Sequence, residues 1–134
     1  MKEIGYVALG GIGGALLRYA LGVSLPQTGG FPLPTLLINL SGCLFLGLFF
    51  TVALDPRRIS PAFRIGIGTG FTGAFTTFST FSVETARLLE DGRIAASLAY
   101  AGISLAGGVA LSGLGVLLGE AWRRRTNPKG GGVS

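Results

Sequence analysis

Four long stretches without a charged residue alternate with short polar segments along the chain. They run over residues 4–17, 31–54, 65–83 and 94–119. A bilayer core about 30 Å thick needs roughly 20 apolar residues of helix, so three of these stretches span it unaided. The first becomes long enough if its helix ends at Arg18 and Tyr19, whose side chains suit the membrane interface. The pattern therefore predicts an all-α integral membrane protein with four transmembrane helices.

The polar segments set the expected bounds of these helices. We expect a single membrane domain over residues 1–134, with helices at about 4–24, 33–54, 62–89 and 94–122 and a basic, Gly-rich tail at 123–134. Ser60 and Pro61 are typical of a helix cap and of the first helical position. Lys2 and the apolar run after it resemble a signal peptide, but Arg18 interrupts the run and no small-residue cleavage motif closes it. We therefore expect this segment to remain as the first helix.

Composition excludes several classes of function. The chain is 49% hydrophobic and only 13% charged, whereas soluble domains carry about 25% charged residues. Its loops are too short for a catalytic domain, and we expect no enzyme. The net charge of +5 comes from residues that flank the hydrophobic spans, which favours contact with anionic lipid over nucleic acid. No His and a single cysteine, Cys43, leave little from which to build a zinc or haem site.

Lys and Arg are distributed unequally between the two ends of the predicted helices. Alternating spans place both termini on one face of the membrane, and that face carries eight of them: Lys2, Arg57, Arg58, Arg64, Arg123, Arg124, Arg125 and Lys129. The opposite face carries three: Arg18, Arg87 and Arg93. The positive-inside rule then predicts that both termini lie in the cytoplasm.

The third predicted helix has an unusual composition. Gly66, Gly68, Gly70 and Gly73 each disfavour helix by about 1 kcal/mol relative to Ala, and we expect a break near residues 73–77. Eight hydroxyl side chains and four phenylalanines follow between residues 69 and 85. Packing glycines and hydroxyls bonded to their own helix would be the simplest explanation. Such a concentration of polar groups inside a membrane more often faces a permeation path.

A broken helix offers groups for ions of both signs. Its freed carbonyls suit a small cation, while the N-terminus of its second half suits an anion. Phenyl rings present positive edges, and the hydroxyls and the Asn39 amide can replace a hydration shell. The sequence therefore predicts an ion pathway beside the break.

Three motifs carry a resemblance to a known family. They are Gly10-Gly11-x-Gly13-Gly14-Ala15-x-x-Arg18-Tyr19, Asn39-x-x-Gly42, and Gly70-Phe71-x-Gly73-Ala74-Phe75-Thr76-Thr77-Phe78-Ser79-Thr80-Phe81-x-x-Glu84. Together with the four-helix pattern they resemble the Fluc/CrcB fluoride channels. The resemblance implies passive export of F⁻ across the bacterial plasma (inner) membrane, which confers fluoride resistance. It also implies a dual-topology, antiparallel (inverted) dimer with two fluoride pathways and a structural Na⁺ at its centre.

The resemblance also implies roles for individual residues. The fluoride pathway would include Asn39, Phe78, Phe81, Ser79, Thr80, Glu84, Tyr100, Ser104 and Arg18. The backbone carbonyls of Gly73 and Thr76 would hold Na⁺. On the fourth helix the family has a Tyr and two Ser at four-residue steps, whereas here Gly108 takes the last step and Ser112 comes one turn later.

Two alternatives concern the partner and the class of transporter. Some members of the family pair two homologous chains of fixed opposite orientation, which the Lys/Arg bias would suit, although we favour a homodimer. A small multidrug antiporter has the same size, but it needs a buried carboxylate that the first helix lacks, since Glu3 stands at its start. A non-transporting membrane subunit would leave the hydroxyl and phenylalanine stripe without a purpose.

Overall fold

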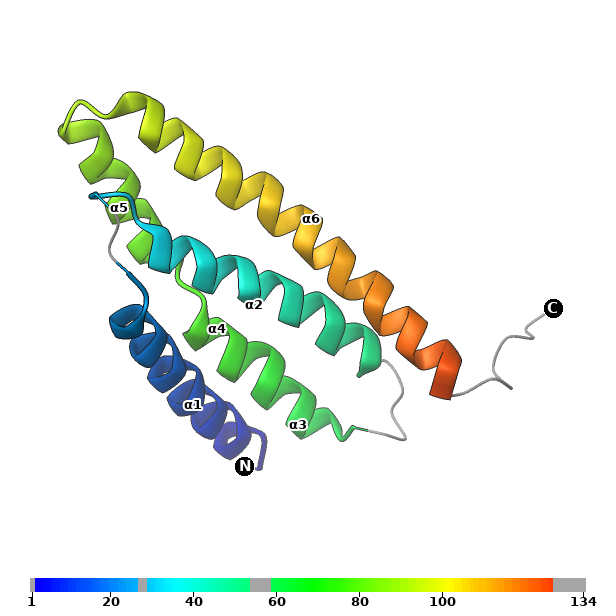
Figure 1. Ribbon diagram of the computed structural model, residues 1–134. Coiled ribbons are helices and arrows are strands. Elements are labelled where there is room, and N and C mark those ends of the chain that lie inside the picture. Colours follow the sequence, from blue (N-terminus) through cyan, green and yellow to red (C-terminus); the bar gives the residue numbers. More distant parts are fainter. Residues whose placement is uncertain (1, 27–28, 54–58, 127–134) are drawn as a thin grey trace.

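Residues 2–26, 29–53 and 59–126 are described by the structure, a computed structural model. The described chain is all-helical, as predicted, and its hydrophobic segments form four helical passes (Figure 1). The elements are α1 (Lys2–Ser24), α2 (Leu33–Val52), α3 (Pro61–Ile65), η1 (Gly66–Phe71), α4 (Thr72–Phe75), α5 (Phe78–Glu90) and α6 (Ile94–Thr126). The third pass thus consists of four successive pieces, α3 to α5, of which η1 is π-helical.

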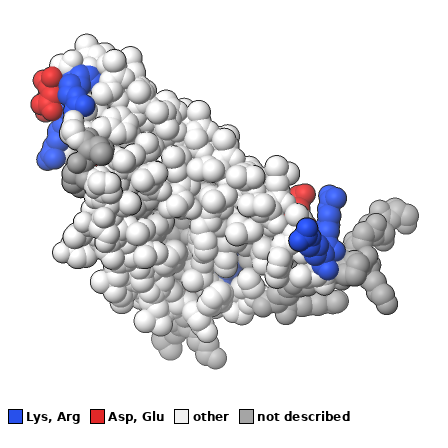
Figure 2. Space-filling model, viewed as in Figure 1, with Lys and Arg blue, Asp and Glu red and all other residues white. Residues whose placement is uncertain are grey.

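Three of these helices are long and apolar enough to cross a membrane. They are Glu3–Ser24, Leu33–Val52 and Ile94–Thr126, among the described residues. The passes alternate in direction, so the start of α1 and the end of α6 lie toward the same end of the bundle (Figure 1). Charged side chains gather mainly at the two ends of the visible face (Figure 2). The chain is therefore a multi-pass membrane protein.

The fourth helix is longer than the sequence pattern suggests. The basic segment assigned to the tail begins inside α6, which continues through Arg123–Arg125 to Thr126. Arginine is a good helix former, and cations at a helix C-terminus are stabilised by the helix dipole. Arg124 also approaches Glu120 one turn earlier, at 4.0 Å. The remainder of the predicted tail, residues 127–134, and the end of the predicted second helix at residue 54 lie outside the described residues.

Glycines allow α1 to lie directly against the third pass. A Cβ atom added to Gly10 would collide with the carbonyl oxygen of Gly66, and one added to Gly14 would collide with that of Phe71. The packing is reciprocal, because a Cβ on Gly70 would collide with the backbone of Val7. Small residues at four-residue spacing permit this backbone contact within a membrane. The glycine spacing of the first helix is thus explained by packing.

The third pass begins as its sequence predicts. The Ser60 hydroxyl accepts the backbone N–H of Phe63 at 3.3 Å, and Pro61 occupies the first turn. Farther along, the backbone N–H of Thr72 reaches back five residues to the carbonyl of Ile67, which marks the π-helical turn. Wide turns of this kind often occur at functional sites. The turn immediately precedes the region in which the helix is interrupted.

Candidate functional site

The third pass is interrupted at two consecutive threonines. α4 ends at Phe75, and Thr76 (φ −84°, ψ 155°) and Thr77 (φ −144°, ψ 118°) have extended backbones before α5 begins at Phe78. Two extended residues remove helical hydrogen bonds on both sides of them. In the middle of a membrane the released backbone groups need other partners.

Asn39 on α2 provides partners for the backbone of Thr77. Its Oδ1 accepts the Thr77 N–H at 2.8 Å, and its Nδ2 donates to the Thr77 carbonyl at 3.1 Å. In an uninterrupted helix the Thr77 N–H would instead bond the carbonyl of Gly73. The side chain of Asn39 therefore stabilises the break and leaves the Gly73 carbonyl without its helical donor.

Thr77 also caps the helix that follows it. Its hydroxyl oxygen accepts the backbone N–H of Thr80 at 3.2 Å and donates to the Thr80 hydroxyl at 3.0 Å. The Thr80 N–H is the group that would otherwise bond the Thr76 carbonyl. Hence the carbonyls of Gly73 and Thr76, the two oxygens expected to hold a cation, both lose their helical partners to side chains. Carbonyl oxygens of this kind suit a hard monovalent cation.

A first cavity, of about 340 Å³, lies between α2, the break and α6. We call it the α2–α6 cavity. It is lined by Asn39, Gly42, Cys43, Leu46, Thr72, Thr76, Thr77, Phe78, Phe81, Ala101, Ser104 and Leu105. The rings of Phe78 and Phe81 lie 5.8 Å apart, tilted by 36°. Phe78 is 80% exposed in the single chain, so its ring is available to a further protein surface.

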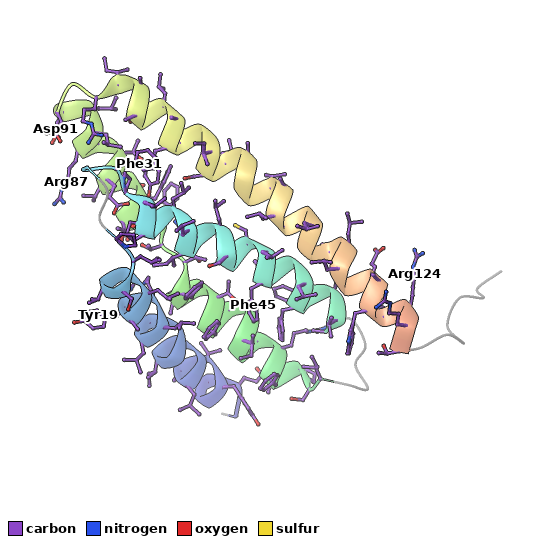
Figure 3. The ribbon with its side chains drawn as sticks, viewed as in Figure 1. Tyr19, Phe31, Phe45, Arg87, Asp91 and Arg124 are labelled. Atoms are coloured by element: carbon purple, nitrogen blue, oxygen red, sulfur yellow. The ribbon has the colours of Figure 1, made fainter. Side chains whose placement is uncertain are left out.

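A second cavity, of about 320 Å³, lies on the other side of the break between α1 and α5. We call it the α1–α5 cavity. Arg18, Thr35, Thr80 and Glu84 are among its lining residues, and Thr77 lines both cavities. The Arg18 Nε atom is buried and has no hydrogen-bond partner among the described residues. Tyr19 stands at the same end of α1 (Figure 3) and is 72% exposed, as an interfacial tyrosine would be.

Glu84 is held by two hydroxyl donors from different helices. The Thr35 hydroxyl donates to its Oε1 at 2.9 Å, and the Tyr100 hydroxyl donates to its Oε2 at 2.8 Å. Tyr100 is completely buried. Its ring lies 5.1 Å from that of Phe81 and 5.7 Å from that of Phe31, which precedes α2 (Figure 3). The carboxylate therefore joins α2, α5 and α6 beside the rings of Phe81 and Tyr100.

Most residues that the sequence singles out fall on the two cavities or on the break itself. Asn39, Phe78, Phe81 and Ser104 line the α2–α6 cavity, whereas Arg18, Thr80 and Glu84 line the α1–α5 cavity, with Tyr100 bonded to Glu84. Two others lie at the surface of the chain. Gly73 is exposed with open space around it, and exposed Ser79 lies 3.3 Å from the Thr77 hydroxyl.

Sequence reasoning missed Thr35 and the two roles of Thr77. The pair Thr76-Thr77 at the expected break was a usable signal for Thr77, because threonine is a favoured helix cap. Nothing near Thr35 in the sequence indicates a partner 49 positions later. Gly108, which the fourth-helix pattern left unexplained, is buried in the structure and faces the Cys43 sulfur.

The site has the character of an ion pathway. Among the described residues no group of three or more His, Cys, Asp or Glu could hold a metal. Backbone carbonyls, hydroxyls, one amide and aromatic rings surround the interrupted helix instead. A multi-pass bundle with these groups at a helix break belongs to the class of ion-conducting membrane proteins.

Comparison with known proteins defines the family. Residues 5–116 match the family described as CrcB-like protein, Camphor Resistance (CrcB). A fluoride-specific ion channel FluC of Synechococcus sp. (strain JA-2-3B'a(2-13)) is 47% identical over 120 residues, which are 87% of this chain and 92% of the relative. Fluoride-specific ion channel FluC 1 of Bacillus cereus (strain ATCC 10987 / NRS 248) is 48% identical over 125 residues, 90% of each chain. The chain therefore belongs to the CrcB/FluC family of channels, which are not enzymes, and the resemblance seen in its motifs is confirmed.

Proposed function

We propose that this chain is the subunit of a passive, fluoride-selective channel that exports F⁻ across the cytoplasmic membrane. The observation that carries the proposal is the break at Thr76 and Thr77, with hydrogen-bond donors and phenyl rings around it. Relatives about 47% identical over most of the chain are named fluoride-specific ion channels. A small, strongly hydrated anion needs donors that replace its water without the tight binding that full positive charges would impose.

The proposed pathway runs beside α5. The rings of Phe78 and Phe81 would offer their edges to the ion, and the second N–H of the Asn39 amide would donate to it. The hydroxyls of Ser79, Thr80 and Ser104 would supply further donors. Arg18 would attract anions to the α1–α5 cavity. Tyr100 and Glu84 would form the last polar groups of the pathway, beyond Phe78 and Phe81.

We further propose that Na⁺ binds at the break and that two antiparallel copies form the channel. The carbonyls of Gly73 and Thr76 lack their helical donors, which supports a cation held by backbone oxygens. Gly73 and Phe78 are both exposed in the single chain. An inverted partner would cover them and would bring a second break against the first, with one fluoride pathway on each side.

Fluoride efflux from liposomes tests the proposal. The purified chain is reconstituted into potassium fluoride-loaded vesicles, and valinomycin is added so that potassium can balance the anion current. We expect rapid fluoride release, no release when chloride replaces fluoride, and no release of a quaternary ammonium cation trapped in the vesicles. Vesicles that release chloride as readily as fluoride would contradict fluoride selectivity, and vesicles that release neither would contradict a channel formed by this chain alone.

A further inference from the structure

Cys43 faces the α2–α6 cavity from the same side of α2 as Asn39. The two residues are one helical turn apart, and both line this cavity of about 340 Å³. A Cβ atom added to Gly108 on α6 would lie 3.3 Å from the Cys43 sulfur. The thiol therefore occupies the space beside α6 at Gly108, where α6 itself has no side chain.

Ser104 provides an independent indication that this part of the cavity holds a polar occupant. Its hydroxyl oxygen is buried and has no hydrogen-bond partner among the described residues. Ser104 lines the same cavity and stands one turn before Gly108 on α6. A buried hydroxyl without a partner is costly, and native proteins satisfy nearly all such groups. A permeating anion would satisfy it.

We propose that the Cys43 thiol is part of the wall of the ion pathway, where it takes the place of a side chain missing from α6 at Gly108. This inference rests on the proposed fluoride channel and names a further residue of its pathway. A thiol is a small, uncharged and weak donor, so it offers a passing anion a contact without trapping it. The competing explanation is that Cys43 is only a small apolar packing residue.

Moving the polar group from one helix to the other separates these explanations. Cys43→Ala removes the thiol, and the fluoride efflux rate should fall about fivefold, the factor that one ordinary hydrogen bond represents. Cys43→Ser keeps a donor at this position and should retain more of the efflux than Cys43→Ala does. Adding Gly108→Ser to Cys43→Ala places a hydroxyl in the vacated space from α6 and should restore efflux to within about twofold of the parent chain.

A matched control uses another glycine of the same helix. A Cβ on Gly102 would meet open space, so Gly102→Ser in the Cys43→Ala background should restore nothing. If Cys43→Ala conducts like the parent chain, or if Gly102→Ser rescues it as well as Gly108→Ser does, the proposal is overturned.

Thiol modification gives a second test in the unmutated chain. Cys43 is its only cysteine. With methyl methanethiosulfonate, the Cys43 sulfur attacks the sulfenyl sulfur, a mixed disulfide forms and methanesulfinate leaves with the thiol proton. With the benzyl analogue the adduct is larger, so efflux should fall further, and dithiothreitol should restore it in both cases. Cys43→Ser should be insensitive to both reagents.

The labelled protein is checked by intact mass before efflux is measured. A chain that carries one adduct and still conducts at the parent rate would overturn the proposal while leaving the proposed channel in place. If the thiol stays unlabelled, the Cys43→Ala and Gly108→Ser variants decide, because a pathway that excludes chloride can also exclude the larger thiosulfonate. A parent chain that conducts no fluoride would overturn both proposals.

Discussion

Asn39 bonds both backbone groups of Thr77, and this arrangement limits what else its side chain can do. The amide oxygen accepts from the Thr77 N–H, and one N–H of Nδ2 donates to the Thr77 carbonyl. An amide nitrogen carries two N–H groups, so one is left for an ion. Asn39 therefore combines a structural role, which the structure shows, with the anion contact that we propose.

Asn39→Asp keeps the hydrogen-bond acceptor at this position and removes the donor. The carboxylate can still accept the Thr77 N–H, but it cannot donate to the Thr77 carbonyl or to an anion, and its negative charge opposes fluoride. We expect the efflux rate to fall at least about tenfold, since hydrogen bonds to charged groups contribute about 1.5–3 kcal/mol. Ser41→Ala is the matched control, because the Ser41 hydroxyl donates to the Ile38 carbonyl on its own helix. Parent-like efflux in Asn39→Asp would refute the anion contact proposed for the amide.

Phe78→Ile tests the aromatic part of the pathway. Isoleucine keeps the apolar volume but has no positive ring edge, so fluoride efflux should drop by about tenfold, near the upper range of aromatic contact energies. Phe63→Ile is the control, since this half-exposed phenylalanine lies on α3 and pairs with Tyr6 away from both cavities. Equal efflux in both variants would remove Phe78 from the pathway.

At the scale of elements, the sequence predicted the helices well and the local form of the third pass only in part. Hydrophobic periodicity and the Ser60-Pro61 cap depend on neighbouring residues, and both can be predicted from the sequence alone. The π-helical turn and the pairing of Thr77 with Asn39 depend on contacts between helices far apart in the chain. The contact of Thr35 with Glu84 spans 49 positions, and no local pattern encodes it.

The glycine contact between α1 and the third pass can be tested through stability. A methyl group at Gly14 would collide with the Phe71 backbone, which cannot move aside as a side chain can. Gly14→Ala should therefore destabilise the protein by about 1–3 kcal/mol, the usual cost of overpacking, and lower its thermal unfolding midpoint in detergent. Gly13→Ala is the neighbouring control, because its nearest contact is the Phe71 side chain at an ordinary 3.7 Å. A Gly14→Ala midpoint as high as that of Gly13→Ala would mean that the two passes do not pack this closely.

At the scale of the whole molecule, the single chain leaves parts of its proposed site uncovered. Phe78 is 80% exposed, although its neighbour Phe81 is half-buried. Exposed apolar side chains along α1 and α6 are expected to meet lipid, but Gly73 and the polar Ser79 are exposed as well. Polar groups and backbone facing lipid are costly. A partner chain that covers the break would remove this cost.

Whether that partner is a second copy depends on how the chain inserts. The predicted cytoplasmic face carries eight Lys and Arg against three on the other face, which opposes insertion in both orientations. Five of the eight, however, belong to the two chain ends: Lys2, Arg123, Arg124, Arg125 and Lys129. Arg124 is at the very end of the long α6 (Figure 3). Without the five charges of the chain ends, the two faces carry three Lys and Arg each.

We therefore expect the chain expressed alone to form an active, antiparallel homodimer. Purified from a host without its own fluoride channels, it should elute as a dimer and release fluoride from liposomes. A single cysteine is introduced into the tail of a Cys43→Ser chain and labelled from either side of the membrane. The labelling should detect both orientations in comparable amounts. A lone chain in one orientation that conducts only when a homologous chain is co-expressed would show that the Lys/Arg bias fixes its topology. In that case the partner across the break is a different chain, and the residues argued for each pathway would come from two sequences.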